Sequence, residues 1–305
     1  MSIITEPSTV FHPGPHQLVR TPNDWQDTPY TRFTLQPMSP TIGAVVRGVS
    51  MADPVDAELF GELNRALLEW KVLFFRDQHI TPAEHATFAS NWGALESHPF
   101  IKHRTDQPED MPEVVRLAKG PKMAGYENIW HSDVTWRLTP SLGSILRAVE
   151  VPEIGGDTLW ADMGAAYDGL SEATKERIDG LLAEHDWINS FGRGMDAATR
   201  DALRPDFPAV QHPVVRTHPE TGRKTLYVNQ AFTQHIVGMD PDDSRDLLDH
   251  LYLRAAFPEY QCRFHWQPGD VAFWDNRSTQ HYATSDYFPQ TRVMERITII
   301  GDRPV

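Results

Sequence analysis

Short strand-like runs follow one another through the second half of the chain, and helices interrupt the strands without the regular alternation of strand and helix. Residues 214–216 and 225–228 flank the turn sequence PETG at 219–222, which predicts a β-hairpin. Residues 271–274 follow another turn, and the apolar run at 296–301 ends the series. Because a parallel sheet would need crossover helices between its strands, this order favours a β-sandwich or jelly-roll barrel over a doubly wound sheet.

The chain before residue 214 adds helices to these strands. Residues 57–70 carry leucines at helical spacing, residues 81–84 form a capping box with proline at the first helical position, and Ser171 can cap a further helix. Short strands are expected at residues 33–35, 42–46 and 72–75. The predicted fold class is therefore mainly β with flanking helices.

Composition bears on the domain organisation. Residues 1–31 are rich in proline and polar residues without periodicity, which predicts an irregular N-terminal arm. Hydrophobic residues make up 40% of the chain, enough for a large core, and no linker interrupts residues 32–305. We expect these residues to form one domain. The arm would lie on its surface or reach toward a neighbouring subunit, and we expect a homo-oligomer.

Charge and cysteine usage limit the partners and the compartment. The chain has 28 Lys and Arg against 42 Asp and Glu, a net charge of -14. Such a field repels phosphate backbones and argues against nucleic-acid binding, so any anionic substrate must meet local cations. A single cysteine, Cys262, allows no intrachain disulfide and fits the cytoplasm. There is no secretory signal pattern and no apolar run of membrane-spanning length, so no membrane segment is expected.

One His-x-Asp motif is a candidate for a metal site. Sites with two histidines and one carboxylate leave metal positions open for substrate and O₂, and residues i and i+2 of a strand share one face. With 14 His and 42 acidic residues, about two chance matches are expected. The two found are His131-Ser132-Asp133 and His218-Pro219-Glu220. The second lies in the hairpin turn, whereas the first lies in apolar, strand-like sequence, where a polar pair is costly to bury without a partner such as a metal.

The remaining candidates lie near the C-terminus. His281, 148 residues after Asp133, follows the strand at 271–274 and can supply the third ligand. Arg292 lies 11 residues further, and its guanidinium can pair bidentately with the far carboxylate of a diacid that chelates the metal. Strand spacing places Arg296 on the same face as Arg292, so Arg296 needs an anion of its own.

Several blocks of sequence, found in order from about Arg32 to the C-terminus, resemble the taurine dioxygenase (TauD/TfdA) family. They are WHSDVT at 130–135, GGDTLW at 155–160, HPVVRTHP at 212–219, WDNRSTQHY at 274–282 and the tail from 286 to 302. The resemblance implies a double-stranded β-helix (jelly-roll) core. It also implies Fe(II) held by His131, Asp133 and His281, with O₂ and 2-oxoglutarate as cosubstrates and Thr158 and Arg292 as anchors of 2-oxoglutarate.

The resemblance also assigns a substrate pocket. His98 and Arg296 fall where taurine enzymes hold the sulfonate, and Phe191 and Phe232 fall where aromatic rings wall the pocket. We expect Trp136 to contact the substrate tail as well. Two positions depart from the taurine enzymes: Ile101 and Glu127 replace a tyrosine and an asparagine near the substrate amine. Glu127 could pair with an ammonium group or indicate a different substrate.

The expected reaction is hydroxylation of the carbon next to an anionic sulfur group, coupled to decarboxylation of 2-oxoglutarate to succinate. A sulfonate such as taurine would release sulfite and an aldehyde, and an alkyl sulfate ester, the alternative, would release sulfate. Two rivals rank below these. A non-catalytic metal-binding jelly-roll protein would not need Arg292, and a zinc hydrolase would need a general base that the sequence does not identify.

Overall fold

A computed structural model describes residues 14–15, 18–20, 28–98, 100, 111–125 and 127–305. The predicted arm at 1–31 lies mostly outside these residues, and so does Ile101. The division into an arm and one domain at 32–305 stays a prediction. Among the described helices, none combines the length and apolar character that a membrane crossing requires.

The largest sheet joins strands from both ends of the sequence. β2 and β3 pair in parallel, and the other neighbouring strands pair antiparallel. Its strand order is β1 (Thr34–Pro37), β2 (Ala44–Arg47), β3 (Val72–Phe75), β13 (Val271–Asp275), β5 (Ser141–Glu150), β15 (Arg292–Ile300) and β4 (Val115–Lys119). The central strands β3 and β13 are buried along their whole length, as their apolar sequences VLFF and VAFWD require.

A smaller antiparallel sheet shares a core with the large one. Its order is β12 (Gln261–Phe264), β6 (Thr158–Asp162) and β14 (Thr279–Ala283). Trp160 of β6 packs edge-on against Phe74 of β3 at 5.3 Å between ring centroids, and Phe74 stacks on Phe264 of β12 at 4.1 Å. Cys262 lies in the same core, and burial raises the pKa of its thiol to about 12.

Further strands and the helices cover the outside. The remaining strands are β11 (Thr233–Ile236), β7 (Leu182–His185) and β8 (Val210–Pro213) in one sheet, and β9 (Val215–Thr217) with β10 (Lys224–Leu226) in a hairpin. The α-helices are α1 (Ala57–Trp70), α2 (Pro82–Ala89), α3 (Met163–Asp168), α4 (Glu172–Ile178), α5 (Ala197–Leu203) and α6 (Pro241–Tyr252). The short 3-10 helices are η1 (Ser90–Trp92), η2 (Phe191–Gly194), η3 (Leu253–Ala256) and η4 (Pro258–Tyr260).

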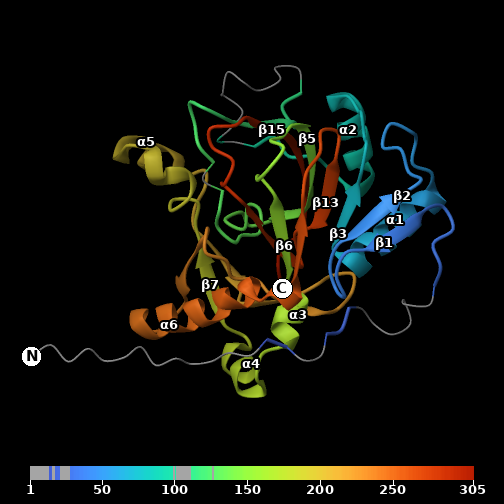
Figure 1. The fold of residues 1–305 in the computed structure, drawn as a ribbon. Helices are drawn as coiled ribbons and strands as arrows, with labels where there is room; N and C mark the ends of the chain where they lie inside the picture. Colours follow the sequence, from blue (N-terminus) through green and yellow to red (C-terminus); the bar gives the residue numbers. More distant parts are fainter. Residues whose placement is uncertain (1–13, 16–17, 21–27, 99, 101–110, 126) are drawn as a thin grey trace, which may run out of the picture.

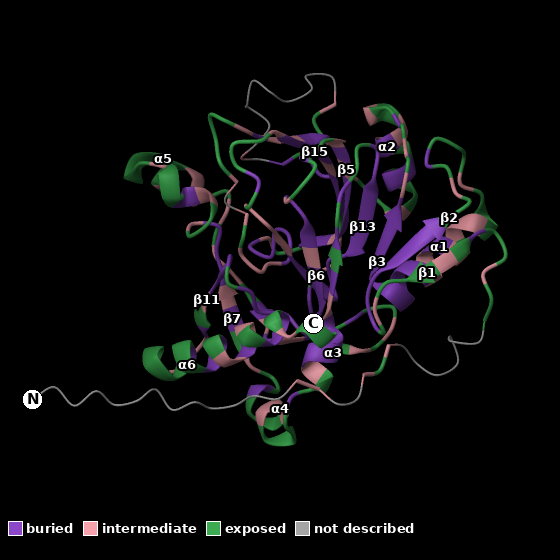
Figure 2. Cartoon of the chain, in the orientation of Figure 1, coloured by how far each residue is buried: buried purple, intermediate pink, exposed green. Residues whose placement is uncertain are grey.

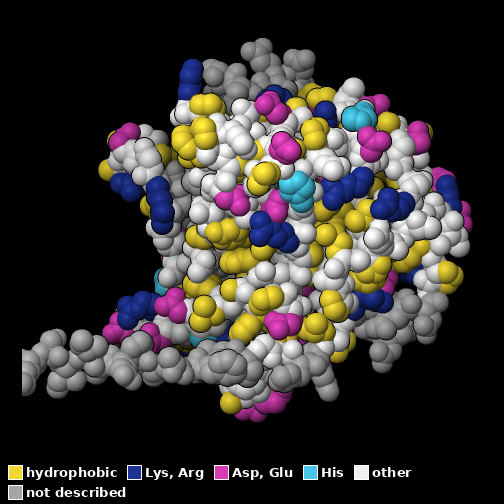
Figure 3. Space-filling view, in the orientation of Figure 1, with side chains coloured by type: hydrophobic (Ala, Val, Ile, Leu, Met, Phe, Trp, Pro, Cys, Tyr) yellow, Lys and Arg dark blue, Asp and Glu magenta, His cyan; other side chains and the backbone are white. Residues whose placement is uncertain are grey.

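The central strands are more deeply buried than the peripheral helices. Figure 1 shows α1 beside the strands of the N-terminal part, with α4, α5 and α6 on the outside of the molecule. The central strands are buried, whereas these three helices expose one side to solvent (Figure 2). On the face shown in Figure 3, Lys and Arg side chains are interspersed with Asp and Glu.

Local signals in the sequence located several elements correctly. The predicted bounds of the helix at 57–70 and of the strand at 72–75 match α1 and β3. Thr81 and Glu84 form the predicted capping box of α2, and Ser171 caps α4. The hairpin at 214–228 is confirmed as β9 and β10, although β9 lies one residue later than predicted and β10 begins one residue earlier and ends two residues earlier.

The last strand, β15, is longer than predicted and begins at Arg292. No strand was predicted at the positions of β4, β5 and β6. The long strand β5 escaped detection because polar and small residues occupy its buried positions. Ser141 and Ser144 are buried there. A Cβ at Gly143 would lie 2.5 Å from the carbonyl oxygen of Trp274, so only glycine permits this approach of β5 to β13.

A buried ionic network fixes the turn between β13 and β14. Asp275, at the end of β13, accepts hydrogen bonds from Arg277 Nε at 2.9 Å and Nη2 at 2.7 Å, and pairs with His218 Nε2 at 3.0 Å. Arg277 also donates to Glu220 at 2.7 Å. Burial alone would raise the pKa of Asp275, but Arg277 and His218 outweigh it and keep the pKa well below the usual value. The turn that leads to His281 is therefore held by the bonds of Asp275 to Arg277 and His218 and by the bond of Arg277 to Glu220.

Candidate active site

Two histidines meet across an antiparallel β-bridge. His131 N–H donates to His281 C=O at 3.1 Å, and His281 N–H donates to His131 C=O at 2.8 Å. His281 lies in β14, but His131 makes only this isolated bridge, and a turn begins at Asp133. The prediction that the His-x-Asp motif lies on a regular strand is therefore wrong. Val134 has a φ of 48°, so the chain turns sharply directly after Asp133.

Asn276 holds the backbone of Asp133 from the other end of the sequence. Its Oδ1 accepts from Asp133 N–H at 2.6 Å, and its Nδ2 donates to Asp133 C=O at 2.9 Å. Ser144 Oγ donates to Asp133 Oδ2 at 2.8 Å. The other carboxylate oxygen, Oδ1, lies 3.9 Å from Nε2 of both His131 and His281. These bonds fix both the main chain and the side chain of Asp133.

This group has the donor set that a metal ion needs. The ligand atoms of His131, Asp133 and His281 all lie within 4.8 Å of one another. His131 Nδ1 lies 2.8 Å from Ile129 C=O and can donate to it, which leaves the Nε2 lone pair directed at the site. Burial keeps the pKa of His281 well below its usual value, so its imidazole is neutral. Two imidazoles and one carboxylate leave positions open on an octahedral metal.

The two predicted arginines lie on β15 with different partners. Arg296 Nη1 donates to Asp133 Oδ1 at 2.8 Å. Arg292 donates from Nε to Gly156 C=O at 3.1 Å and from Nη2 to Thr158 Oγ1 at 3.3 Å. Among the described residues, no carboxylate forms an ion pair with Arg292, although its side chain is buried. Thr158 and Arg292 both line a cavity of about 60 Å³ that also reaches His131 and His281.

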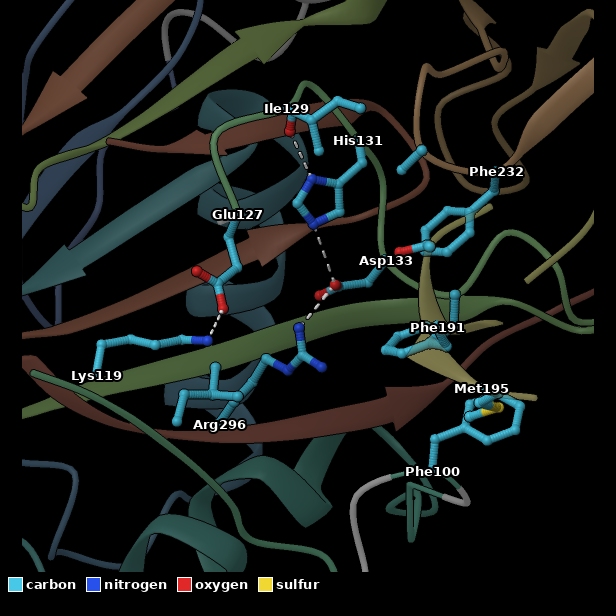
Figure 4. A pocket seen from close by; sticks show the side chains of 14 residues that line it. Phe100, Lys119, Glu127, Ile129, His131, Asp133, Phe191, Met195, Phe232 and Arg296 are labelled. Carbon is cyan, nitrogen blue, oxygen red and sulfur yellow. Dashed lines mark hydrogen bonds and ion pairs between the residues drawn. The ribbon is translucent and has the colours of Figure 1, made fainter. Parts of the chain in front are cut away.

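A larger cavity of about 310 Å³ adjoins the first. Charged groups line one side of it and apolar groups the other (Figure 4). The charged residues are Lys119, Glu127, Asp133 and Arg296, and the apolar ones include Phe100, Ile129, Phe191, Met195 and Phe232. Phe191, on η2, stacks on Phe232 at 6.1 Å between ring centroids. The cavity therefore offers a charged end near the metal ligands and an aromatic wall.

Two predicted substrate residues do not line this cavity in the part of the chain that is described. Trp136 is 1% exposed and packs behind Phe100 and Phe191. His98 is also buried and lies against Phe191 at 5.2 Å, with no hydrogen bond to Nε2 from any described residue. Burial, aided by the charges of Arg296 and Arg137, lowers the pKa of His98 to about 3, so its imidazole is neutral.

Lys119 was missed by the sequence interpretation. It lines both cavities, and its Nζ lies 2.9 Å from Glu127 Oε1. A possible signal was the alternation in the sequence VRLAK at 115–119, which places Val115, Leu117 and Lys119 on one face of a strand. The sequence could not show that this strand pairs with β15, and therefore that Lys119 lies opposite Arg292.

Comparison with known proteins identifies the family. The family model "Taurine catabolism dioxygenase TauD, TfdA family" matches residues 34–298. The chain belongs to this family. It is therefore an Fe(II)- and 2-oxoglutarate-dependent dioxygenase, an oxidoreductase that consumes O₂.

Individual relatives match almost over their whole length. An alkylsulfatase of Acinetobacter baylyi is 36% identical over 90% of this chain and 87% of its own. An alpha-ketoglutarate-dependent sulfate ester dioxygenase of Pseudomonas putida is 36% identical over 89% and 90%. The crystal structure of a taurine dioxygenase from Burkholderia xenovorans has a TM-score of 0.77 and 36% identity, covering 90% of this chain and 91% of that one.

The hydrogen bonds of Asn276 generate a prediction about metal binding by this dioxygenase. Asn276→Ala removes both bonds to the Asp133 backbone, so the carboxylate loses its fixed position. We expect the affinity for Fe(II) or Mn(II) to fall by about 10–100-fold, the range found when groups that orient metal ligands are removed. Calorimetric titration without O₂ measures this affinity. Asn91→Ala, on the exposed helix η1, is the matched control. An unchanged affinity in Asn276→Ala would show that Asp133 is positioned by other contacts.

Proposed function

We propose that this dioxygenase oxidises the carbon next to the anionic sulfur group of a substrate with an apolar tail, either an alkyl sulfonate or an alkyl sulfate. The observation that carries the proposal is the two-sided cavity, with Arg296 at the end nearest Asp133 and an aromatic wall beyond it. The names of the two sulfur-ester relatives support an alkyl sulfate in particular. Taurine fits this cavity less well, because Glu127 is already paired with Lys119.

Each residue has a role in this proposal. His131, Asp133 and His281 hold Fe(II), which supplies the oxidation of a C–H bond by O₂ with decarboxylation of 2-oxoglutarate. Thr158 and Arg292 bind the far carboxylate of 2-oxoglutarate, since Arg292 is a buried cation without a carboxylate partner among the described residues. Next to Asp133, Arg296 binds the sulfur oxygens. Phe191 and Phe232 contact the tail, and Trp136 and His98 pack against Phe191 outside the cavity.

Broader features of the protein belong to the same proposal. We propose that the two facing sheets form a double-stranded β-helix, which is supported by their common core and by the bridge between His131 and His281. A homo-oligomer in the cytoplasm remains our expectation. The lone, buried Cys262 is compatible with a reducing compartment.

Loss of any metal ligand should abolish activity. His131→Ala, Asp133→Ala and His281→Ala should each lower Fe(II)-dependent succinate formation by more than about 100-fold, beyond what an orienting residue contributes. Each should also lose high-affinity metal binding in a titration. His79→Ala is the control, because His79 is exposed and pairs only with Asp77 within the described part of the chain. A variant of the three that kept near-normal turnover would remove that residue from the ligand set.

Arg292 should determine the affinity for 2-oxoglutarate. Removing one partner of a buried charge pair costs about 2–5 kcal/mol, so Arg292→Ala should raise the KM for 2-oxoglutarate far more than the KM for the sulfur compound. Steady-state succinate formation with each substrate varied in turn measures both. Arg245→Ala, an exposed arginine of α6, should change neither. The opposite ordering of the two effects would transfer the cosubstrate role to Arg296.

Arg296 should determine the preference for an anion. The unaltered enzyme should use an alkyl sulfonate and an alkyl sulfate much better than the neutral alcohol of equal length. Arg296→Gln should reduce that preference by about 2–5 kcal/mol of transition-state binding. Competition assays with the matched compounds measure the ratio directly. Equal turnover of the alcohol and the sulfonate by the unaltered enzyme would contradict the proposed substrate class.

A further inference from the structure

Lys119 and Glu127 form an ion pair in the wall that the two cavities share. Both residues line the cavity with the aromatic wall and the smaller cavity with Thr158 and Arg292. The Lys119 side chain is 5% exposed and that of Glu127 32%, with 2.9 Å between Nζ and Oε1. Figure 4 shows the pair on the same side of the cavity as Arg296, across from Phe191 and Phe232.

Because of this pair, the described lining of the cavity holds no carboxylate that a cationic group of a substrate could bind without disturbing an existing ion pair. The described carboxylates in its lining are Asp133 and Glu127. Asp133 faces the two histidines and Arg296, and Glu127 faces Lys119. An incoming ammonium group would have to share Glu127 with Lys119 or displace Lys119 from it. Either arrangement places a second positive charge beside the buried Lys119 ammonium, with the Glu127 carboxylate between them to balance only one of the two.

We propose that Lys119 is a specificity-determining residue, which holds Glu127 and thereby makes the cavity select monoanions with an apolar tail over zwitterions that carry an ammonium group. The inference rests on the proposed function, because it concerns the far end of a substrate whose anionic head lies at Arg296. It explains why two substrates with the same sulfur group would differ in kcat/KM, which binding of the head group alone does not determine.

The register of the large sheet offers a competing role for the same pair. Lys119 of β4 lies directly opposite Arg292 of β15, and like charges at opposite positions are destabilising. Glu127 could therefore serve only to balance the charge beside 2-oxoglutarate. The two roles predict different kinetic effects. A role in selectivity changes the ratio between two sulfur substrates, whereas a role beside Arg292 changes the KM for 2-oxoglutarate.

The test compares two compounds that differ only in a terminal methyl or ammonium group. Butane-1-sulfonate and 3-aminopropane-1-sulfonate are one such pair, and butyl sulfate and 3-aminopropyl sulfate are the corresponding sulfate esters. The unaltered enzyme should prefer the methyl compound in kcat/KM. Lys119→Met removes the ammonium that holds Glu127, and we expect the preference to fall by about tenfold or more. Anaerobic calorimetry with Fe(II) and 2-oxoglutarate should show the same change in the ratio of the two Kd values.

Further variants make the comparison specific to this pair. Lys119→Gln keeps a hydrogen-bond donor for Glu127 without the charge, so the same direction of change is expected even if Lys119→Met folds poorly. The double variant with Lys119→Met and Glu127→Gln has no carboxylate to offer, and its preference for the methyl compound should return. Lys122→Met removes the same charge three residues away at an exposed position and should leave the ratio unchanged.

Two results would overturn the inference. The first is an unchanged ratio in both Lys119 variants, and the second is a KM for 2-oxoglutarate that rises by more than the ratio changes. Failure of the proposed function would look different, because the unaltered enzyme would then form no succinate above background with any of the four sulfur compounds.

Discussion

The two hydrogen bonds between Asn276 and the backbone of Asp133 connect segments that are 143 residues apart, and the geometry of the site depends on them. Asp133 lies in a turn rather than a strand, so no sheet hydrogen bonds fix its position. Asn276 supplies that constraint. Its own N–H donates to Leu142 C=O at 2.9 Å, and the residue before it, Asp275, is bonded to Arg277 and His218. Such buried networks are costly unless every member is satisfied, which links the stability of this turn to the placement of the carboxylate.

Electrostatics gives the substrate pocket a definite charge requirement. Among the described residues that line the two cavities, three are cations, namely Lys119, Arg292 and Arg296, and two are carboxylates, Glu127 and Asp133. Their net charge is one positive unit. Fe(II) adds two positive charges and the 2-oxoglutarate dianion removes them. One positive charge then remains in a poorly hydrated site, and a monoanionic substrate neutralises it, whereas a zwitterion does not.

The sequence predicted the parts of this protein that depend on local patterns. The apolar spacing of α1, the capping box of α2 and the continuous apolar run of β3 each act within a few residues, and each was located correctly. Resemblance to the family supplied the metal and arginine positions. The conformation around Asp133 could not be predicted, because Asn276 lies 143 residues further along the chain. The partner of Glu127 could not be predicted either, because no local pattern indicates that the Lys119 side chain faces it. Trp136 was predicted to line the pocket because it lies close to Asp133 in the sequence, but its ring packs behind Phe191.

The elements that carry the site divide it into a constrained part and a variable part. Thr158, His281 and Arg292 belong to strands β6, β14 and β15, where sheet hydrogen bonds fix the backbone. By contrast, the residues around the substrate tail lie on the short helix η2, in the loop before β11 and at the edge strand β4. Loops and edges accept substitutions without loss of the core. The oxidation chemistry is therefore anchored in the sheets, and the selection of the substrate can change through a few residues on the short helix, the loop and the edge strand.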